Sequence, residues 1–308
     1  MVNIYRHVPD IHTLSREYSP SSCVTDIRKF TDAYAARSAA VRDQSPDRRT
    51  IQYGASSAEV LDFFPAPSLL SVRIPRPVLA YIHGGYWQEL SKDDHSFPAD
   101  ALRRHDFSYV AIGYGLAPAA TLDEMVERCR RAILWIAQHC EEFAIDPGAI
   151  HVAGSSAGAH LAAMTGMTDW SSFGLAASPI RSLTLLSGVF DLRPLMLTYV
   201  NDVVRMTEEA AMRNSPLLLL DTLPRLFPQT LIVYGDNETG EFKRQSVDFF
   251  DALTRKGYVA RLQEIRGRNH FDLPFDLADE STDCGSISLR HFGSAANRVR
   301  NSSVDMDC

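Results

Sequence analysis

The sequence has few cysteines, no long apolar run and no cluster of basic residues. Its five cysteines are an odd number without the paired spacing of a zinc site, so we expect reduced thiols, no metal and no cofactor. No stretch is apolar enough to cross a bilayer, and the N-terminal residues lack the hydrophobic core of a signal peptide, which favours a cytoplasmic protein without a membrane partner. Lys and Arg occur at most in pairs and the formal net charge is -7, which argues against a nucleic-acid partner.

The sequence instead contains a regular alternation of apolar strands and amphipathic helices. Strand-like apolar patterns occur at residues 59–66, 77–85, 107–115, 149–154, 182–190, 229–235 and 259–265. Helix-like patterns occur at residues 26–42, 121–143, 157–164 and 241–256, with Thr121 placed to cap the second of them. This order predicts an α/β fold with a mostly parallel sheet covered by helices on both faces. In such folds functional groups lie at the carboxyl ends of the strands.

No repeat and no long linker divides the chain, so we expect a single domain over residues 1–300. Residues 1–50 are expected to form a helical N-terminal extension that contributes to a cap. Residues 301–308 are expected to be a frayed tail.

A small-residue turn follows the apolar stretch 149–153. Its sequence Gly-Ser-Ser-Ala-Gly, residues 154–158, fits the motif G-x-S-x-G with Ser156 at the centre. In that motif a sharp strand-to-helix turn exposes a nucleophilic serine, and the glycines let neighbouring backbone approach closely. The alternative is a turn that only packs a helix against a sheet. The catalytic interpretation requires partners for the serine elsewhere in the chain.

A serine nucleophile needs a base, usually a histidine that a carboxylate holds in one tautomer. His270 lies in a polar loop just after the last predicted strand, where the base is expected. His160 and His291 are less suitable, because the first lies on the helix after Ser156 and the second in the C-terminal stretch. The acid is expected in the loop after residues 229–235, where Glu238 has the favoured offset and Asp236 is the alternative.

A second glycine motif, His-Gly-Gly-Tyr-Trp at residues 83–87, follows the apolar stretch that begins at residue 77. Acyl transfer places negative charge on the carbonyl oxygen, and preorganised backbone N–H groups stabilise that charge. Gly84 and Gly85 would let such groups point inward, and the N–H of Ala157 would add another donor. The alternative is an ordinary strand-to-loop turn.

Several segments together resemble kynurenine formamidase (arylformamidase), a serine-hydrolase branch of the α/β-hydrolase fold related to hormone-sensitive-lipase-type esterases. From about residue 80 to 275 they are "HGGYWQELSKDDHSF", "YGLAPAATLDEMV", "SSAGAHLAAM", "SGVFDL", "RNSPLL", "EFKRQSVDFF" and "NHFDL". The resemblance implies Ser156 as nucleophile, His270 as base, and Gly85 and Tyr86 as oxyanion donors. Animal members have Asp at the acid position, which Glu238 occupies here.

The resemblance implies hydrolysis of N-formyl-L-kynurenine to L-kynurenine and formate through a formyl-serine intermediate, and hence a small-molecule aryl formamide or ester as partner. Tyr86 and Trp87 are expected to limit the acyl side of the pocket. Tyr114 and Phe190 are candidates to stack on the aromatic leaving group, although both residues also suit a hydrophobic core. A short-chain carboxylesterase and a non-catalytic ligand receptor are the alternatives. A homodimer is left open.

Overall fold

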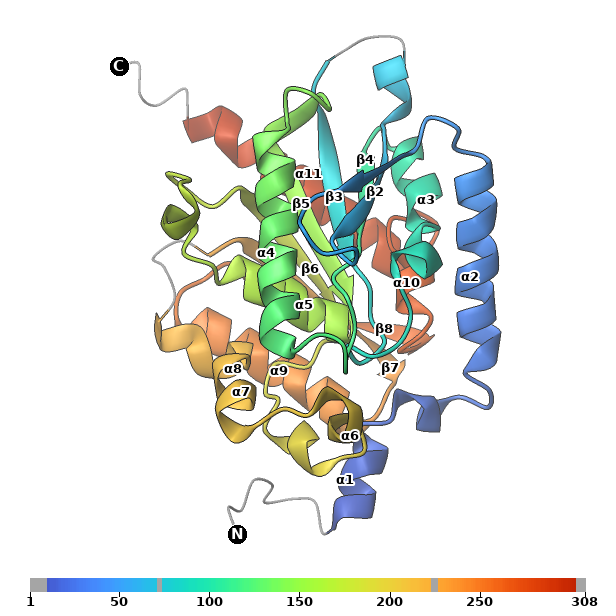
Figure 1. The fold of residues 1–308 in the computed structure, drawn as a ribbon, viewed down its shortest axis with the longest axis vertical. Coiled ribbons are helices and arrows are strands. Elements are labelled where there is room, and N and C mark those ends of the chain that lie inside the picture. Colours follow the sequence, from blue (N-terminus) through green and yellow to red (C-terminus); the bar gives the residue numbers. More distant parts are fainter. Residues whose placement is uncertain (1–9, 71–73, 223–226, 303–308) are drawn as a thin grey trace.

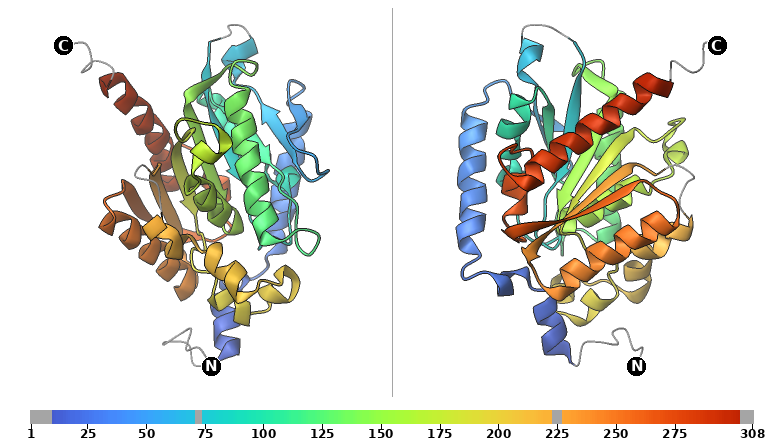
Figure 2. Two further views of the ribbon diagram at one scale, coloured as in Figure 1. Left: turned by 60° about the vertical axis from the view of Figure 1, so that its left-hand side comes forward. Right: turned by 180° about the vertical axis from the view of Figure 1, so that it is seen from behind.

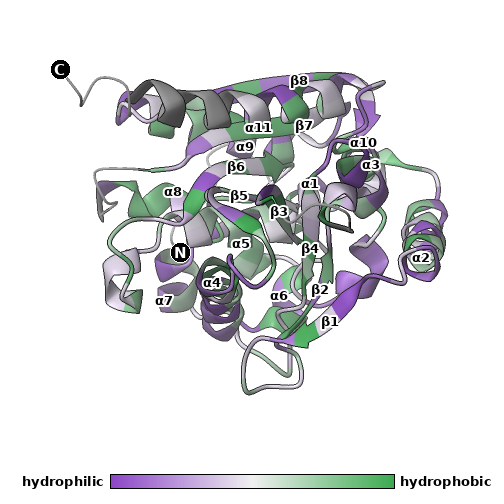
Figure 3. Cartoon of the chain, turned by 90° about the horizontal axis from the view of Figure 1, so that it is seen from above, coloured by the Kyte–Doolittle hydropathy of each residue, from purple (hydrophilic) through white to green (hydrophobic). Residues whose placement is uncertain are grey.

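The computed structural model describes residues 10–70, 74–222 and 227–302 and contains an eight-stranded sheet (Figure 1). Its order is β1-β2-β4-β3-β5-β6-β7-β8, and Figure 3 shows the strand labels in this sequence across the molecule. The strand β2 is antiparallel to both neighbours, and all other neighbours pair in parallel. The strands are β1 Arg49–Gln52, β2 Val60–Phe64, β3 Arg76–Ile82, β4 Ser108–Ile112, β5 Ile145–Ser155, β6 Ile180–Leu186, β7 Gln229–Asn237 and β8 Ala260–Asn269.

Helices cover both faces of the sheet. The helices α4 and α5 lie on the front face in Figure 1, and α11 crosses the rear face in the right-hand view of Figure 2. The helices are α1 Ile11–Glu17, α2 Arg28–Asp43, α3 Pro98–Arg104, α4 Leu122–Gln138, α5 Ala157–Gly166, α6 Val200–Val204, α7 Glu208–Arg213, α8 Pro216–Leu219, α9 Gly240–Arg255, α10 Leu273–Asp276 and α11 Asp283–Ser302. Among the residues that the structure describes, no helix is both long and apolar enough to cross a membrane.

Two hydrophobic cores follow from the alternation of side chains along the strands. In β3, Val78, Ala80 and Ile82 belong to the core with α4, α5 and α9, and the intervening Leu79 and Tyr81 belong to the core with α3, α10 and α11. A strand buried on both faces in this way reads as a continuous apolar run. The apolar run at residues 77–85 predicts such a strand, and the mostly parallel sheet covered by helices on both faces agrees with the predicted α/β fold.

The elements agree with the sequence in most places. The side chain of Thr121 accepts a hydrogen bond from the N–H of Glu124, and the Glu124 carboxylate accepts one from the N–H of Thr121. This capping box begins α4 where we expected it. The short strand β1 was not predicted, because its residues are mostly exposed and show no alternation. Residues 301–302 end α11, and residues 303–308 of the expected tail lie outside the described residues.

Candidate active site

Ser156 lies at the tight turn between β5 and α5. Its backbone has φ 55° and ψ -121°, a conformation that costs energy for a residue with a side chain. The neighbouring glycines make the turn possible. A Cβ atom on Gly154 would lie 2.3 Å from the carbonyl oxygen of Gly158, and one on Gly158 would lie 2.0 Å from the carbonyl oxygen of Ile82. The predicted G-x-S-x-G turn is therefore the one that the backbone adopts.

His270 and Glu238 form a buried pair at the same end of the sheet. The Nδ1 atom of His270, just after β8, lies 3.0 Å from Oε2 of Glu238, just after β7. His270 is 6% exposed and Glu238 is 8% exposed. Because Nδ1 faces the carboxylate, Nε2 is the nitrogen left to face a nucleophile. Asp236, the alternative acid, instead accepts a hydrogen bond at Oδ1 from the N–H of Arg268. The structure thus brings Glu238, and not Asp236, to His270.

Ser156 and His270 line one cavity of about 310 Å³. The cavity lies at the carboxyl ends of the strands, and the N-terminal segment before and within α2 supplies part of its wall. Its lining residues are Pro20, Ser21, Ile27, Thr31, Tyr34, Gly84, Gly85, Tyr86, Gln88, Glu89, Leu90, His95, Ser155, Ser156, Tyr199, His270, Phe271 and Pro274. This volume suits a small-molecule ligand.

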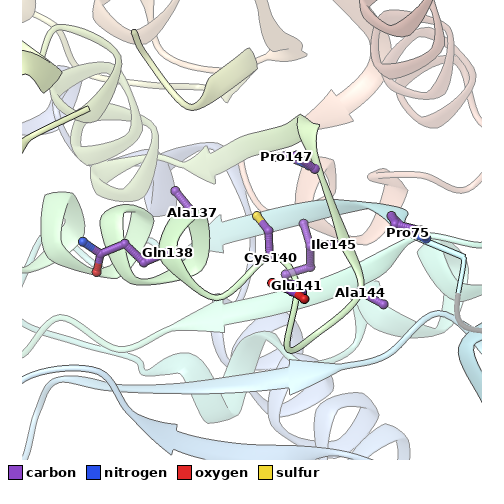
Figure 4. A pocket seen from close by; sticks show the side chains of 8 residues that line it. All are labelled: Pro75, Ala137, Gln138, Cys140, Glu141, Ala144, Ile145 and Pro147. Atoms are coloured by element: carbon purple, nitrogen blue, oxygen red, sulfur yellow. The ribbon is translucent and has the colours of Figure 1, made fainter. Parts of the chain in front are cut away.

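A larger hollow of about 520 Å³ lies elsewhere, beside Cys140 and Glu141 (Figure 4). Pro75 and Ile145, which also line it, stand at the amino ends of β3 and β5. Its lining contains no serine and no histidine. Since the serine and histidine are at the opposite strand ends, this hollow is not the candidate active site.

The turn after β3 presents unpaired N–H groups near Ser156. Gly85 has φ 105° and Tyr86 has φ 48°, so the chain passes through the left-handed region there. Within the described residues, the N–H groups of Gly84, Gly85, Tyr86 and Ala157 donate no hydrogen bond. Buried N–H groups are usually paired. Four such groups around one serine are therefore suited to bind an anionic oxygen.

The side chain of Tyr86 is held from the N-terminal segment. Its hydroxyl donates to the carbonyl oxygen of Tyr18 at 2.5 Å, and burial raises the pKa of Tyr86 well above its usual value. The hydroxyl of Tyr18 in turn donates to Oε2 of Glu241 in α9 at 2.7 Å. The N-terminal segment therefore joins the glycine turn to α9 and fixes the wall of the cavity.

Three residues predicted to contact the substrate lie in the core instead. Trp87, Tyr114 and Phe190 are each 0% exposed, and none of them lines the cavity. Their rings pack against His160, His83 and Phe249, respectively. An aromatic residue near the end of a buried strand can point into the core or toward the ligand, and the sequence alone does not distinguish the two. The structure leaves only Tyr86 of the predicted set at the cavity.

The other two candidate bases are structural. His160 Nε2 lies 2.7 Å from the carbonyl oxygen of Asn214, and His291 Nε2 lies 3.1 Å from that of Leu183. Burial lowers the pKa of each histidine to about 4. Neither histidine lines the cavity with Ser156.

Two site residues were missed from the sequence. Ser187, directly after β6, donates from Oγ to Oε1 of Glu238 at 2.5 Å. His95 lines the cavity, and its Nδ1 lies 3.3 Å from the carbonyl oxygen of Ser91. Burial lowers the pKa of His95 to about 4, so this ring is neutral near pH 7. A polar residue directly after a buried strand, as at Ser187, is a signal that could have been used.

The fold and these residues define the class of protein: a hydrolase of the α/β-hydrolase fold. The crystal structure of EstE1, a thermostable carboxylesterase from a metagenomic library, aligns with a TM-score of 0.68 at 21% identity. The alignment covers 89% of this chain and 97% of EstE1. Residues 69–178 also match the family model BD-FAE.

Sequence similarity narrows the family further. The chain is 33% identical to the kynurenine formamidase of Danio rerio over 288 residues, which cover 91% of this chain and 96% of the fish protein. The kynurenine formamidase of Salmo salar is also 33% identical, with the same coverage of each chain. The protein belongs to the kynurenine formamidase family.

Proposed function

We propose that this protein hydrolyses N-formyl-L-kynurenine to L-kynurenine and formate. The observation that carries the proposal is the buried pair of His270 and Glu238, 3.0 Å apart, beside the cavity that also contains Ser156. Family membership supports the substrate class, because the fish relatives are named kynurenine formamidases. The geometry supplies the reaction type, which is acyl transfer to a serine.

The reaction begins when the hydroxyl of Ser156 attacks the formyl carbon. His270 accepts the hydroxyl proton at Nε2, while Glu238 stabilises the resulting imidazolium from Nδ1. The tetrahedral oxyanion binds to the N–H groups of Gly85, Tyr86 and Ala157. Removal of one such donor typically costs about 3 kcal/mol in the transition state.

The intermediate then collapses and releases the arylamine. His270 donates its proton to the departing aniline nitrogen, and the C–N bond breaks to leave a formyl ester on Ser156. Water, activated by His270, attacks this ester. The C–O bond to Ser156 breaks, formate leaves, and the serine regains its proton.

The experiment is a comparison of N-formyl-L-kynurenine with acetyl and butyryl nitrophenyl esters under matched conditions. We expect wild type to hydrolyse the formamide and Ser156→Ala to lose all turnover. The thermal unfolding temperature of Ser156→Ala is expected to equal that of wild type, which shows that the variant is folded. Labelling with an organophosphate, followed by mass mapping, is expected to modify Ser156. A preference for butyryl esters without formamide turnover would instead identify a short-chain carboxylesterase. Turnover that persists in Ser156→Ala would refute the assignment of the nucleophile.

We also propose that residues 1–300 act as one domain in the cytoplasm, on a small-molecule substrate. The packing of the described helices on one sheet supports the single domain. A homodimer stays a prediction, which measurement of the mass in solution tests.

A further inference from the structure

The glycine turn after β3 carries two hydrogen-bond acceptors in addition to its N–H groups. Gln88 and Glu89 both line the cavity with Ser156. The Oε1 atom of Gln88 is buried and has no hydrogen-bond partner among the described residues. A buried amide oxygen without a partner is costly, and a bound donor would remove that cost.

The charge of the cavity lining has one sign. Glu89 is the one carboxylate among the lining residues, and no Lys or Arg is found among them. Within the described part of the chain, the Glu89 carboxylate has no ion-pair or hydrogen-bond partner. Burial lowers the pKa of the lining residue His95 to about 4, so that ring is neutral near pH 7. The wall therefore favours a group that is positively charged and rich in N–H donors.

The turn holds the backbone of Gln88 and Glu89 at a fixed position relative to the oxyanion donors. The N–H groups of Gln88 and Glu89 both donate to the carbonyl oxygen of Gly85, at 3.0 and 2.8 Å. The turn is so tight that a Cβ atom on Gly85 would lie 2.1 Å from the carbonyl oxygen of Glu89. Both side chains start from this fixed backbone and line the same cavity as Ser156, where they can contact a substrate whose carbonyl Ser156 attacks.

We infer that Gln88 and Glu89 form a subsite for a primary ammonium group on the leaving arylamine. This inference rests on the proposed function and assigns to Gln88 and Glu89 the recognition of the α-ammonium group that N-formyl-L-kynurenine carries. The Gln88 oxygen accepts one N–H of the ammonium, and the Glu89 carboxylate supplies the opposite charge. Because Glu89 is exposed to solvent, its contribution is screened by salt.

The test compares N-formyl-L-kynurenine with its desamino analogue, which lacks only the α-amino group. The measured quantity is the ratio of kcat/KM for the two substrates. We expect wild type to favour the amino substrate, and the ratio to fall about fivefold in Glu89→Gln and about threefold in Gln88→Leu. Glu89→Lys is expected to lower the ratio further, and raising the salt concentration to 0.5 M (roughly a 4 Å screening length) is expected to weaken the preference.

Glu142→Gln is the matched control. It removes the same charge just before the amino end of β5, at the opposite end of the sheet, and is expected to leave the ratio within about 1.5-fold. A ratio that does not change in Glu89→Gln and Glu89→Lys would overturn the subsite, while formamide turnover would still support the proposed function.

A failure of the proposed function is recognised separately. In that case wild type hydrolyses nitrophenyl acetate but neither formamide. The inhibition constants of L-kynurenine and of its desamino analogue in the ester reaction then test the subsite directly. Stronger inhibition by L-kynurenine that is lost in Glu89→Gln supports an ammonium subsite, and equal inhibition refutes it.

Discussion

Ser187 and Glu238 lie at the ends of the neighbouring strands β6 and β7, and their side chains meet at 2.5 Å between Oγ and Oε1. The N–H of Gly235 donates to the same oxygen at 2.6 Å, and the other oxygen, Oε2, faces His270. Ser187 is 1% exposed and has φ 48°. The two donors on Oε1 hold the carboxylate so that Oε2 points in a fixed direction. They restrict the side chain of Glu238, which has one more rotatable bond than an aspartate.

Ser187→Ala removes one of these donors and is expected to lower kcat about tenfold with little change in KM. Ser187 does not line the cavity, so the loss is expected in the chemical step and not in binding. Steady-state kinetics with N-formyl-L-kynurenine measure the two constants. Ser182→Ala is the control, because its buried hydroxyl lies near the start of the same strand and pairs with His151 Nδ1 at 2.7 Å.

A double-mutant cycle separates positioning from a general structural defect. If Ser187 acts only through Glu238, its substitution in a Glu238→Gln background has no additional effect on kcat. A loss of equal size in both backgrounds would show that Ser187 serves the fold instead. A wild-type kcat in the single variant Ser187→Ala would also contradict the prediction.

Glu238→Gln is expected to reduce kcat/KM about 10³-fold, because the amide cannot stabilise the imidazolium of His270 as a carboxylate does. Asp236→Asn is expected to remain within about threefold of wild type, since Asp236 Oδ1 bonds the N–H of Arg268 and not the imidazole. Both substitutions remove one negative charge at the carboxyl end of β7, which makes them a matched pair. The reverse ranking in the same assay would return the acid role to Asp236.

The residues of the pair could be predicted because their types and chain order are restricted. The base is expected in the loop after the last strand and the acid in the stretch after residues 229–235, where the sequence has His270 and two carboxylates. The choice between the carboxylates depended on an offset of two residues. The structure explains that offset, since Glu238 reaches Gly235, Ser187 and His270 at once.

The wall of the cavity could not be predicted in the same way. Thr31 and Tyr34 line it only because α2 passes beside the strand ends, and the sequence of a surface helix does not say where it docks. The misplaced aromatics have a related cause. Tyr114 and Phe190 lie beyond the ends of β4 and β6, where a small change of direction decides between core and ligand. Periodicity predicts which residues are buried, but it does not say against which partner.

Gly158→Ala is expected to destabilise the protein by more than about 3 kcal/mol or to prevent folding. The added Cβ atom would lie 2.0 Å from the carbonyl oxygen of Ile82, and the backbone of β3 cannot retreat without breaking its pairing with β5. Gly293→Ala is the control, because among the described residues no atom beyond its chain neighbours and its own helix backbone lies within 4 Å of its Cβ position in α11. That substitution is expected to stabilise by up to about 1 kcal/mol. Urea unfolding measures both, and equal effects would contradict the close packing of α5 on β3.

The stability of the protein is expected to fall steeply as the pH drops from 6.5 toward 4. Burial lowers the pKa of His83 and His151 to about 3, and that of His95, His160 and His291 to about 4. An unfolded chain takes up protons at these histidines near pH 6.5, whereas the folded protein does not. The unfolded state therefore binds more protons throughout this window. The stability that these neutral histidines contribute is fully present above pH 6.5. It is lost as the pH falls toward their pKa values in the folded protein.

The size of this loss is set by the number of buried histidines. Each one that binds a proton only on unfolding lowers the free energy of unfolding by about 1.4 kcal/mol per pH unit. Urea titrations at pH 7.5, 6.0 and 5.0 (about one unit or more apart, so that the slope is resolved) measure the dependence. In His160→Gln the amide can still donate to the carbonyl oxygen of Asn214. The change in the free energy of unfolding per pH unit is expected to decrease by the contribution of one histidine. A free energy that stays constant from pH 7.5 to 5.0 would show that these rings are charged in the folded protein, contrary to their burial.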